Sequence, residues 1–155
     1  MAFQIQALPM ERFDALVGKS ESELNANGVF RREVDCKPGY PCRVSLIDAS
    51  VGETVLLMNY THLNGPSPYR ASHAIFVREQ AETANFGPNE VPPALRIRLL
   101  SLRGFDANGL MRNADVVHGR ELEARLETLL AEPDIAFVDI HNAKPGYFAA
   151  RAVAC

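Results

Sequence analysis

Two cysteines, Cys36 and Cys42, flank a Lys-Pro-Gly-Tyr-Pro turn in the stretch "DCKPGYPCR". Redox dithiols usually have the spacing C-x-x-C, and structural zinc sites usually combine a close cysteine pair with a second pair. The C-x(5)-C spacing fits neither class, and zinc would need distant histidines such as His73 and His141 as further ligands. We therefore predict no metal site and no cofactor. The chain has three cysteines, and this odd number argues against a disulfide framework.

Cys42 is also a candidate nucleophile. The guanidinium of the adjacent Arg43 would favour the thiolate, which is the attacking form of cysteine. His141 could act as the base, oriented by Asn142 or by Asp139, which lies two residues away and so on the same face of a strand. The alternative is that Cys42 is a small buried apolar residue in line with its neighbours, as free cysteines often are.

Arginine is frequent in the region that we expect to form strands, and its side chain suits bidentate binding of carboxylate or phosphate. The residues concerned are Arg43, Arg70, Arg78, Arg96, Arg98 and Arg103. If some of them converge with Tyr69 and His73, they would bind a small anionic molecule. The alternative is a solvated sheet face with weak surface ion pairs. His62 and His118 fall in polar segments that we expect to be exposed, and we assign them no role.

The elements that must position these residues follow from periodicity. The N-terminal part combines a strand in "FQIQAL", a helix over residues 9–17 and a second short helix after the capping box of Ser20 and Glu23. From residue 29 a period of two predicts strands in "VFRREV", "RVSLID", "TVLLMNY", "AIFVRE", "LRIRLLSLRGF" and "LMRNADVV". "DANG" is a hairpin signal, "RELEARLETLLAE" an amphipathic helix, and "IAFVDIHNA" with "YFAARAV" a second hairpin.

Together these elements predict an α+β fold in one globular domain over residues 1–155. The expected architecture is a mainly antiparallel β-sheet, flat or curled toward a barrel, with two or three helices packed on it. The longest irregular stretch is "THLNGPSPYRAS", residues 61–72, and loops of this length are often functional.

Composition narrows the class of protein. The chain has 155 residues, 47% hydrophobic and 23% charged, with a formal net charge of -3, which suits a globular protein and gives no field that would attract nucleic acid or an anionic membrane. The sequence begins without a basic segment followed by an apolar one, and no apolar run approaches the roughly 18 residues of a membrane helix. We expect a cytoplasmic protein whose thiols stay reduced, and a homodimer is compatible with the sequence.

Several blocks resemble an uncharacterised bacterial family known as domain of unknown function 1203: "PGYPCRVSLIDASVGETVLLMNY", "SPYRASHAIFVRE", "RLLSLRGFDANGLM" and "HNAKPGYFAAR". The resemblance spans nearly the whole chain and implies no activity. It points to Cys42, Arg43, Asp48, Glu53, Tyr69, Arg70, Arg78, Glu79, Arg98, Arg103, His141 and Asn142. The chain departs from the family pattern in two places: His73 and Ala74 stand where members commonly have Gly-Pro, and Tyr147 where many have cysteine.

Our leading hypothesis is a pocket for a small anionic molecule where the 36–43 turn, the 61–73 loop and the "HNAKPG" hairpin meet. Arg43 and Arg70 would hold the anionic group, and Tyr69, His73 and Asn142 would complete the binding site. If the protein is an enzyme, Cys42 and His141 would be its catalytic residues. The alternative is a non-catalytic interaction or assembly protein, in which Arg43 or Arg70 pairs internally with Asp48 or Glu79.

Overall fold

A computed structural model describes residues 2–155 of the chain. The strands are β1 (Phe3–Gln6), β2 (Phe30–Glu33), β3 (Thr54–Leu63), β4 (Ala71–Arg78), β5 (Leu99–Phe105), β6 (Met111–His118), β7 (Phe137–Asn142) and β8 (Phe148–Ala154). The helices are α1 (Glu21–Ala26), α2 (Pro93–Arg96) and α3 (Leu122–Leu130), with 3-10 turns at Met10–Arg12, Asp14–Leu16 and Gly119–Glu121.

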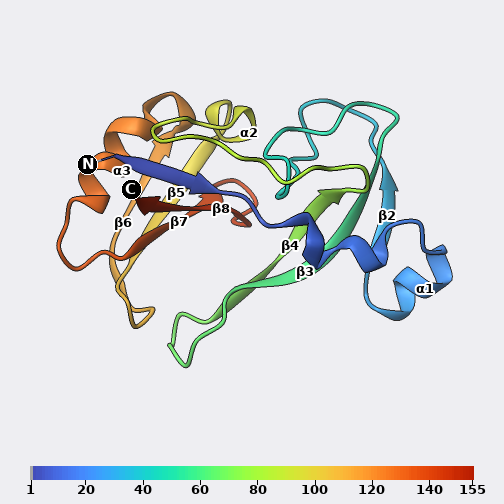
Figure 1. The fold of residues 1–155 in the computed structure, drawn as a ribbon, viewed down its shortest axis with the longest axis horizontal. Coiled ribbons are helices and arrows are strands. Elements are labelled where there is room, and N and C mark those ends of the chain that lie inside the picture. Colours follow the sequence, from blue (N-terminus) through green and yellow to red (C-terminus); the bar gives the residue numbers. More distant parts are fainter. Residues whose placement is uncertain (1) are drawn as a thin grey trace.

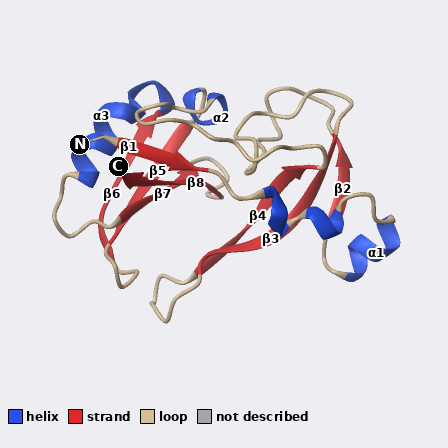
Figure 2. Ribbon diagram, viewed as in Figure 1, coloured by secondary structure: helices blue, strands red, loops and turns tan. Residues whose placement is uncertain are grey.

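The predicted α+β fold is confirmed, with all strand pairs antiparallel. Within residues 2–155 the strands form two sheets, in the orders β1-β8-β7-β5-β6 and β2-β3-β4, rather than one sheet curled toward a barrel. Figure 1 shows the two sheets side by side, with α3 beside the larger and α1 beside the smaller. Figure 2 shows that loops carry the chain between the sheets and that short helices lie within these connections.

One face of the five-stranded sheet packs on α3. The leucines of "LEARLETLL" that recur at helical spacing are buried against alternating apolar residues of β5, β7 and β8, as the sequence predicted. Burial of each such side chain contributes about 1.5–3 kcal/mol. The opposite face carries polar residues, among them Asp139 and His141 on β7, which faces the smaller sheet. No helix within residues 2–155 is long and apolar enough to cross a membrane.

The three-stranded sheet has a separate core. Alternate residues of β3 and β4, including Leu56, Met58, Ile75 and Val77, pack against Leu24 of α1 and the segment around Cys42. The same alternation continues along β3 to Tyr60 and His62, and along β4 to His73. The end of this buried face therefore points polar rings, rather than aliphatic side chains, toward the five-stranded sheet.

Two loop regions make non-covalent contacts that hold the two sheets together. Residues 41–49 pair with β4 through the Arg43 backbone and carry Val44 into the smaller core but Leu46 into the larger one. At the other end, the β3–β4 loop reaches the β5–β6 turn, where the Ser67 hydroxyl donates to the Gly109 carbonyl at 2.6 Å.

Three local predictions were wrong. "RVSLID" is a turn, because the Leu46 amide donates back to the Cys42 carbonyl and Leu46 takes a positive φ of 55°. Residues 95–98 lie in α2 and the turn after it, since the preceding pair Pro92-Pro93 starts a helix rather than a strand. Residues 9–17 form two 3-10 turns instead of one α-helix.

The capping box at the start of α1 is confirmed and gives the first prediction. The Ser20 hydroxyl accepts from the Glu23 amide at 3.2 Å, so Ser20→Ala leaves a helix-terminal donor without its partner. We expect a loss of about 1 kcal/mol in the free energy of unfolding, measured by urea denaturation. Ser22→Ala, inside the same helix and exposed, is the matched control and should be neutral or slightly stabilising. Equal effects of the two substitutions would contradict the capping role.

Candidate functional site

A cavity of about 630 Å³ lies where the two sheets meet. The 38–43 turn and the 142–147 turn form part of its wall. Of the three segments that were expected to form a pocket, the 36–43 turn and the "HNAKPG" hairpin therefore do meet. The rest comes from β3, β4 and residues 97–99, and none of the described lining residues falls within 61–73. Apolar side chains such as Leu57, Phe76 and Leu99 alternate there with the cations Arg43, Arg98 and Lys144.

Arg43 is the most buried cation in this wall, with 3% of the residue exposed. Its Nε donates to the Phe148 carbonyl at 2.7 Å, and its Nη1 donates to the Pro41 carbonyl. Burial lowers the pKa of the guanidinium to about 10, so it keeps its charge at neutral pH. Among residues 2–155, no carboxylate lies within ion-pair distance of Arg43.

The other polar lining residues differ in how they are satisfied. Arg98 binds Asp48 with two bonds of 2.7 and 2.9 Å, so its charge is already neutralised. Asn142 is buried, and its Oδ1 has no hydrogen-bond partner within the described residues. An unpartnered buried acceptor is costly. Within residues 2–155, the cavity wall therefore holds one buried cation without an ion-pair partner, Arg43, and one free buried acceptor, Asn142, while the unpaired Lys144 is exposed.

Cys42 lies in the core of the smaller sheet with 1% exposed. Its sulfur accepts from the amides of Ser45 and Arg78 at 3.4 and 3.3 Å. The side chain of Arg43 instead extends toward β8 and lines the cavity. Cys42 therefore lies outside the cavity wall. Within residues 2–155 its sulfur accepts from these two amides and not from His141.

Tyr69 and Arg70 lie at the base of the β3–β4 loop, and both are exposed. The Tyr69 ring packs on Phe105, with the ring centroids 6.0 Å apart. Neither residue lines the cavity. The structure therefore does not bring them together with Arg43 or Asn142, whereas it brings His73 beside His141, with ring centroids 5.2 Å apart.

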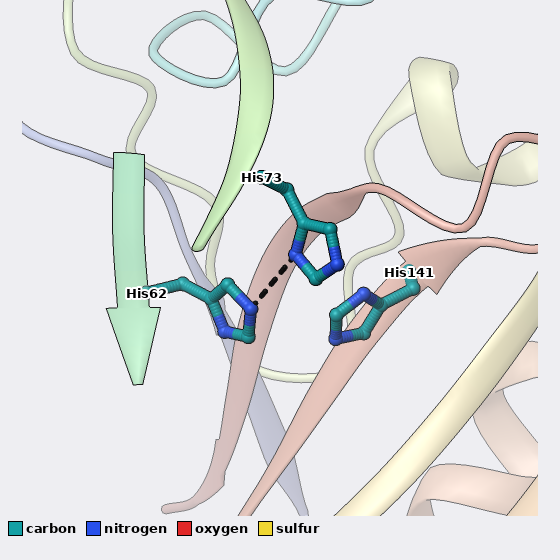
Figure 3. Close-up of side chains that lie close together, drawn as sticks. All are labelled: His62, His73 and His141. Atoms are coloured by element: carbon teal, nitrogen blue, oxygen red, sulfur yellow. Dashed lines mark hydrogen bonds between the residues drawn. The ribbon is translucent and has the colours of Figure 1, made fainter. Parts of the chain in front are cut away.

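Three histidines gather between the sheets: His62 from β3, His73 from β4 and His141 from β7. One ring nitrogen of each lies within 4.8 Å of the others, and Figure 3 shows the three rings around a common space. His73 and His141 were among the predicted site residues, but His62 was expected to be exposed and is 9% exposed instead. The prediction was wrong because β3 continues past Tyr60 to Leu63, which keeps His62 on its buried face.

The hydrogen bonds around this cluster fix the orientation of two rings. The His62 Nδ1 lies 3.3 Å from Oδ2 of Asp139, and the His141 Nδ1 lies 3.1 Å from the carbonyl oxygen of Gly146. The His73 Nδ1 lies 2.9 Å from the His62 Nε2. The remaining nitrogen of His141, Nε2, is buried and has no partner within residues 2–155.

The electrostatics of the cluster disfavour protonation of the rings. Burial lowers the pKa of His141 to about 3, helped by the charge of Arg103 on the neighbouring strand. Burial also lowers the pKa of His73. Asp139 is fully buried, and although burial opposes its ionisation, hydrogen bonds from His62 and Arg151 hold its pKa below the ordinary value. The rings of His73 and His141 are therefore neutral at pH 7, as metal ligands must be.

Comparison with known proteins adds a family but no activity. A family model described as "Protein of unknown function (DUF1203)" matches residues 39–153, which include all three clustered histidines and both cavity turns except Pro38. No curated protein and no solved structure matches the chain.

Proposed function

Because the chain belongs to the family described as protein of unknown function (DUF1203), a description that assigns no activity, we propose a function from the geometry of its cavity. The 630 Å³ cavity binds a small anionic molecule. The observation that carries this proposal is the buried guanidinium of Arg43 in the cavity wall. Buried charges in proteins are normally paired, and an anionic ligand would supply the partner that the described residues do not.

The lining restricts the chemistry of the ligand further. Carboxylate, sulfonate or phosphate would suit the guanidinium of Arg43, with Lys144 at the exposed rim. The free Oδ1 of Asn142 would accept from a hydroxyl or N–H group of the ligand. Leu57, Phe76 and Leu99 would contact an apolar or aromatic body. We assign no catalytic role to Cys42, whose sulfur accepts bonds from backbone amides within the core.

One observation favours a second function, that of a non-catalytic protein whose motif residues only stabilise turns. Arg43 bridges the Pro41 and Phe148 carbonyls, and so ties the 38–43 turn to β8. Asp48 pairs with Arg98 and Glu79 with Arg31, which are internal pairs of the kind this function requires, although the partners differ from those expected. In this case the cavity would show no preference for anions.

Two dyes that share an anilinonaphthalene skeleton separate these functions. 8-Anilinonaphthalene-1-sulfonate carries a sulfonate and an N–H donor, whereas N-phenyl-1-naphthylamine lacks the sulfonate. We expect the sulfonate dye to bind at least about tenfold more tightly in fluorescence titrations, which corresponds to about 1.4 kcal/mol. Equal affinities of the two dyes would contradict anion binding and favour the structural function.

Ile97→Glu tests where the dye binds. Ile97 lines the cavity but is 51% exposed, so the substitution places a negative charge at the mouth with little risk to the fold. Sulfonate-dye affinity should fall by about tenfold or more. Val116→Glu is the control, because Val116 is equally exposed at 56% but lies on β6 outside the cavity lining. A similar loss in both variants would place the dye elsewhere.

We also propose a cytoplasmic location for the protein. All three cysteines are free, with Cys36 and Cys155 exposed. Exposed free thiols persist in reducing compartments, where glutathione and thioredoxin keep them reduced.

A further inference from the structure

The histidine cluster has an unusual proton arrangement. A carboxylate and a carbonyl can only accept hydrogen bonds, so the Nδ1 atoms of His62 and His141 carry the protons that face Asp139 and Gly146. When both rings are neutral, their lone pairs lie on the two Nε2 atoms. The proton on the His73 Nδ1 satisfies the lone pair of His62 at 2.9 Å. The lone pair of His141 remains buried without a donor in the described structure.

We propose that His62, His73 and His141 bind one divalent transition-metal ion, through Nε2 of His62, Nε2 of His141 and Nδ1 of His73, leaving a fourth position open. The ion would occupy the space that the three rings surround in Figure 3. It would satisfy the lone pair of His141 and replace the hydrogen bond between His62 and His73. For this, neutral His73 changes tautomer: its proton leaves Nδ1 and another is taken up at Nε2, with no net change in protonation.

The partners of the rings favour a metal. Metal-bound histidines usually donate their second ring nitrogen to a carboxylate or a backbone carbonyl, which orients the ring and raises its basicity. The Asp139 carboxylate is the acceptor for Nδ1 of His62, and the Gly146 carbonyl is the acceptor for Nδ1 of His141. Asp139 is itself held by two bonds from Arg151, so it is fixed before any ion binds.

The donor set points to the class of ion. Three neutral imidazoles suit zinc, copper, nickel or iron, whereas calcium and magnesium prefer oxygen ligands. Three histidines with an open fourth position is also an arrangement found in catalytic rather than structural zinc sites. The cysteines add no ligand, since Cys42 is bonded to backbone amides in the core and Cys36 and Cys155 are exposed.

The surrounding charges indicate what the fourth ligand is. Asp139 carries one negative charge, while Arg151 is paired to it and Arg103 lies on β5 opposite Asp139, its Nε 3.3 Å from the Ser101 hydroxyl. The Arg103 guanidinium forms no ion pair within residues 2–155. It would repel an added cation unless an anion came with it. The fourth ligand is therefore an anion, such as hydroxide or a small carboxylate.

The proposed metal centre is separate from the anion cavity, so the metal proposal and the anion proposal can be tested independently. None of the three histidines lines the 630 Å³ cavity, whereas His62 lines a second cavity of about 160 Å³. That smaller cavity and the half-buried side of His73 provide routes from solvent to the cluster. Dye binding in the larger cavity and metal binding at the histidines are therefore tested by different measurements.

The experiment uses zinc alone as the probe, in protein prepared without a polyhistidine tag. All variants carry Cys36→Ser and Cys155→Ser, so that the exposed thiols cannot capture the metal. We expect one Zn²⁺ per chain in competition with a chromophoric chelator. His73→Gln should weaken binding by more than about 100-fold, since loss of a ligand should exceed the 10–100-fold typical of a second-layer partner. His118→Gln replaces the fourth histidine of the chain and should leave zinc affinity unchanged.

A spectroscopic measurement keeps the test independent of how any variant folds. Zinc-edge X-ray absorption of the histidine-intact protein should show three imidazole nitrogens and one oxygen or halide ligand. Co²⁺ substitution should give the visible bands of a four-coordinate site in this protein and in His118→Gln, but not in His73→Gln. The proposal is overturned if zinc binds His73→Gln as tightly as the histidine-intact protein, or if the bound zinc has no imidazole ligands.

Discussion

Asp139→Ala is expected to lower the free energy of unfolding of the metal-free protein by about 3 kcal/mol, in urea denaturation at pH 7. Asp139 is fully buried and accepts from Arg151 at 2.7 and 3.1 Å and from His62 at 3.3 Å. Removing it leaves a guanidinium that is only 30% exposed and a buried imidazole donor without their acceptor. Losing one partner of a buried pair costs far more than losing an exposed one, because the remaining charge is not solvated.

Asp115→Ala is the matched control for this result. Asp115, on β6 of the same sheet, also pairs with an arginine, Arg125 of α3, but both side chains are more than 30% exposed. Such pairs contribute roughly 0–1 kcal/mol. If the two substitutions destabilised the protein equally, Asp139 would not be the buried acceptor that organises the face of β7 toward the histidines.

The metal-free protein is expected to lose about 2.5 kcal/mol of stability as the pH falls from 6.5 to 4.5. The folded-state pKa of His141 is about 3, because of its burial, whereas the unfolded chain takes up the same proton near 6.5. Below pH 6.5 the unfolded state therefore binds one more proton, and stability falls by about 1.4 kcal/mol for each pH unit. His73, with its lowered pKa, adds to the loss in the same direction.

The upper part of the acid range isolates the histidines. The carboxylates with lowered pKa values, such as Asp139 and Glu79, lose their contribution only as the pH falls from their ordinary pKa values of 3.8 and 4.5 toward the lowered ones. His141→Gln should flatten the pH dependence between 6.5 and 4.5, because glutamine does not titrate. His118→Gln should leave it unchanged. An unaltered slope in His141→Gln would mean that His141 is protonated in the folded protein and hence not the neutral ring inferred here.

Much of the fold was predictable because it depends on local signals. The hairpin at "DANG", the amphipathic α3 and the final β7–β8 pair each follow from turn chemistry or periodicity within a short window. The separation into two sheets was not predictable in this way. It depends on which strands pair over long distances in the chain, and the turn at residues 43–48 that separates the two cores looks like a strand in the sequence.

The histidine cluster shows what limited the site prediction. Asp139 and His141 were expected on one face of a strand, and this is confirmed by their pairing with Arg103 and Ser101. Continuing the alternation of Leu56, Met58 and Tyr60 by two residues would have found His62 as well. His62 and His141, however, are 79 residues apart in the sequence, and they meet only because the two sheets pack on each other. No local sequence pattern predicts such a contact.

Phe148 contacts one residue of each proposed site. Its carbonyl holds the Nε of Arg43 at the wall of the anion cavity, while its ring stacks on His62 at a centroid distance of 4.7 Å and an interplanar angle of 7°. The ring and the carbonyl belong to the same residue, so a movement of Phe148 would affect both contacts. If metal binding at the histidines changed the affinity for the anion through Phe148, the anion would change the affinity for the metal by the same factor.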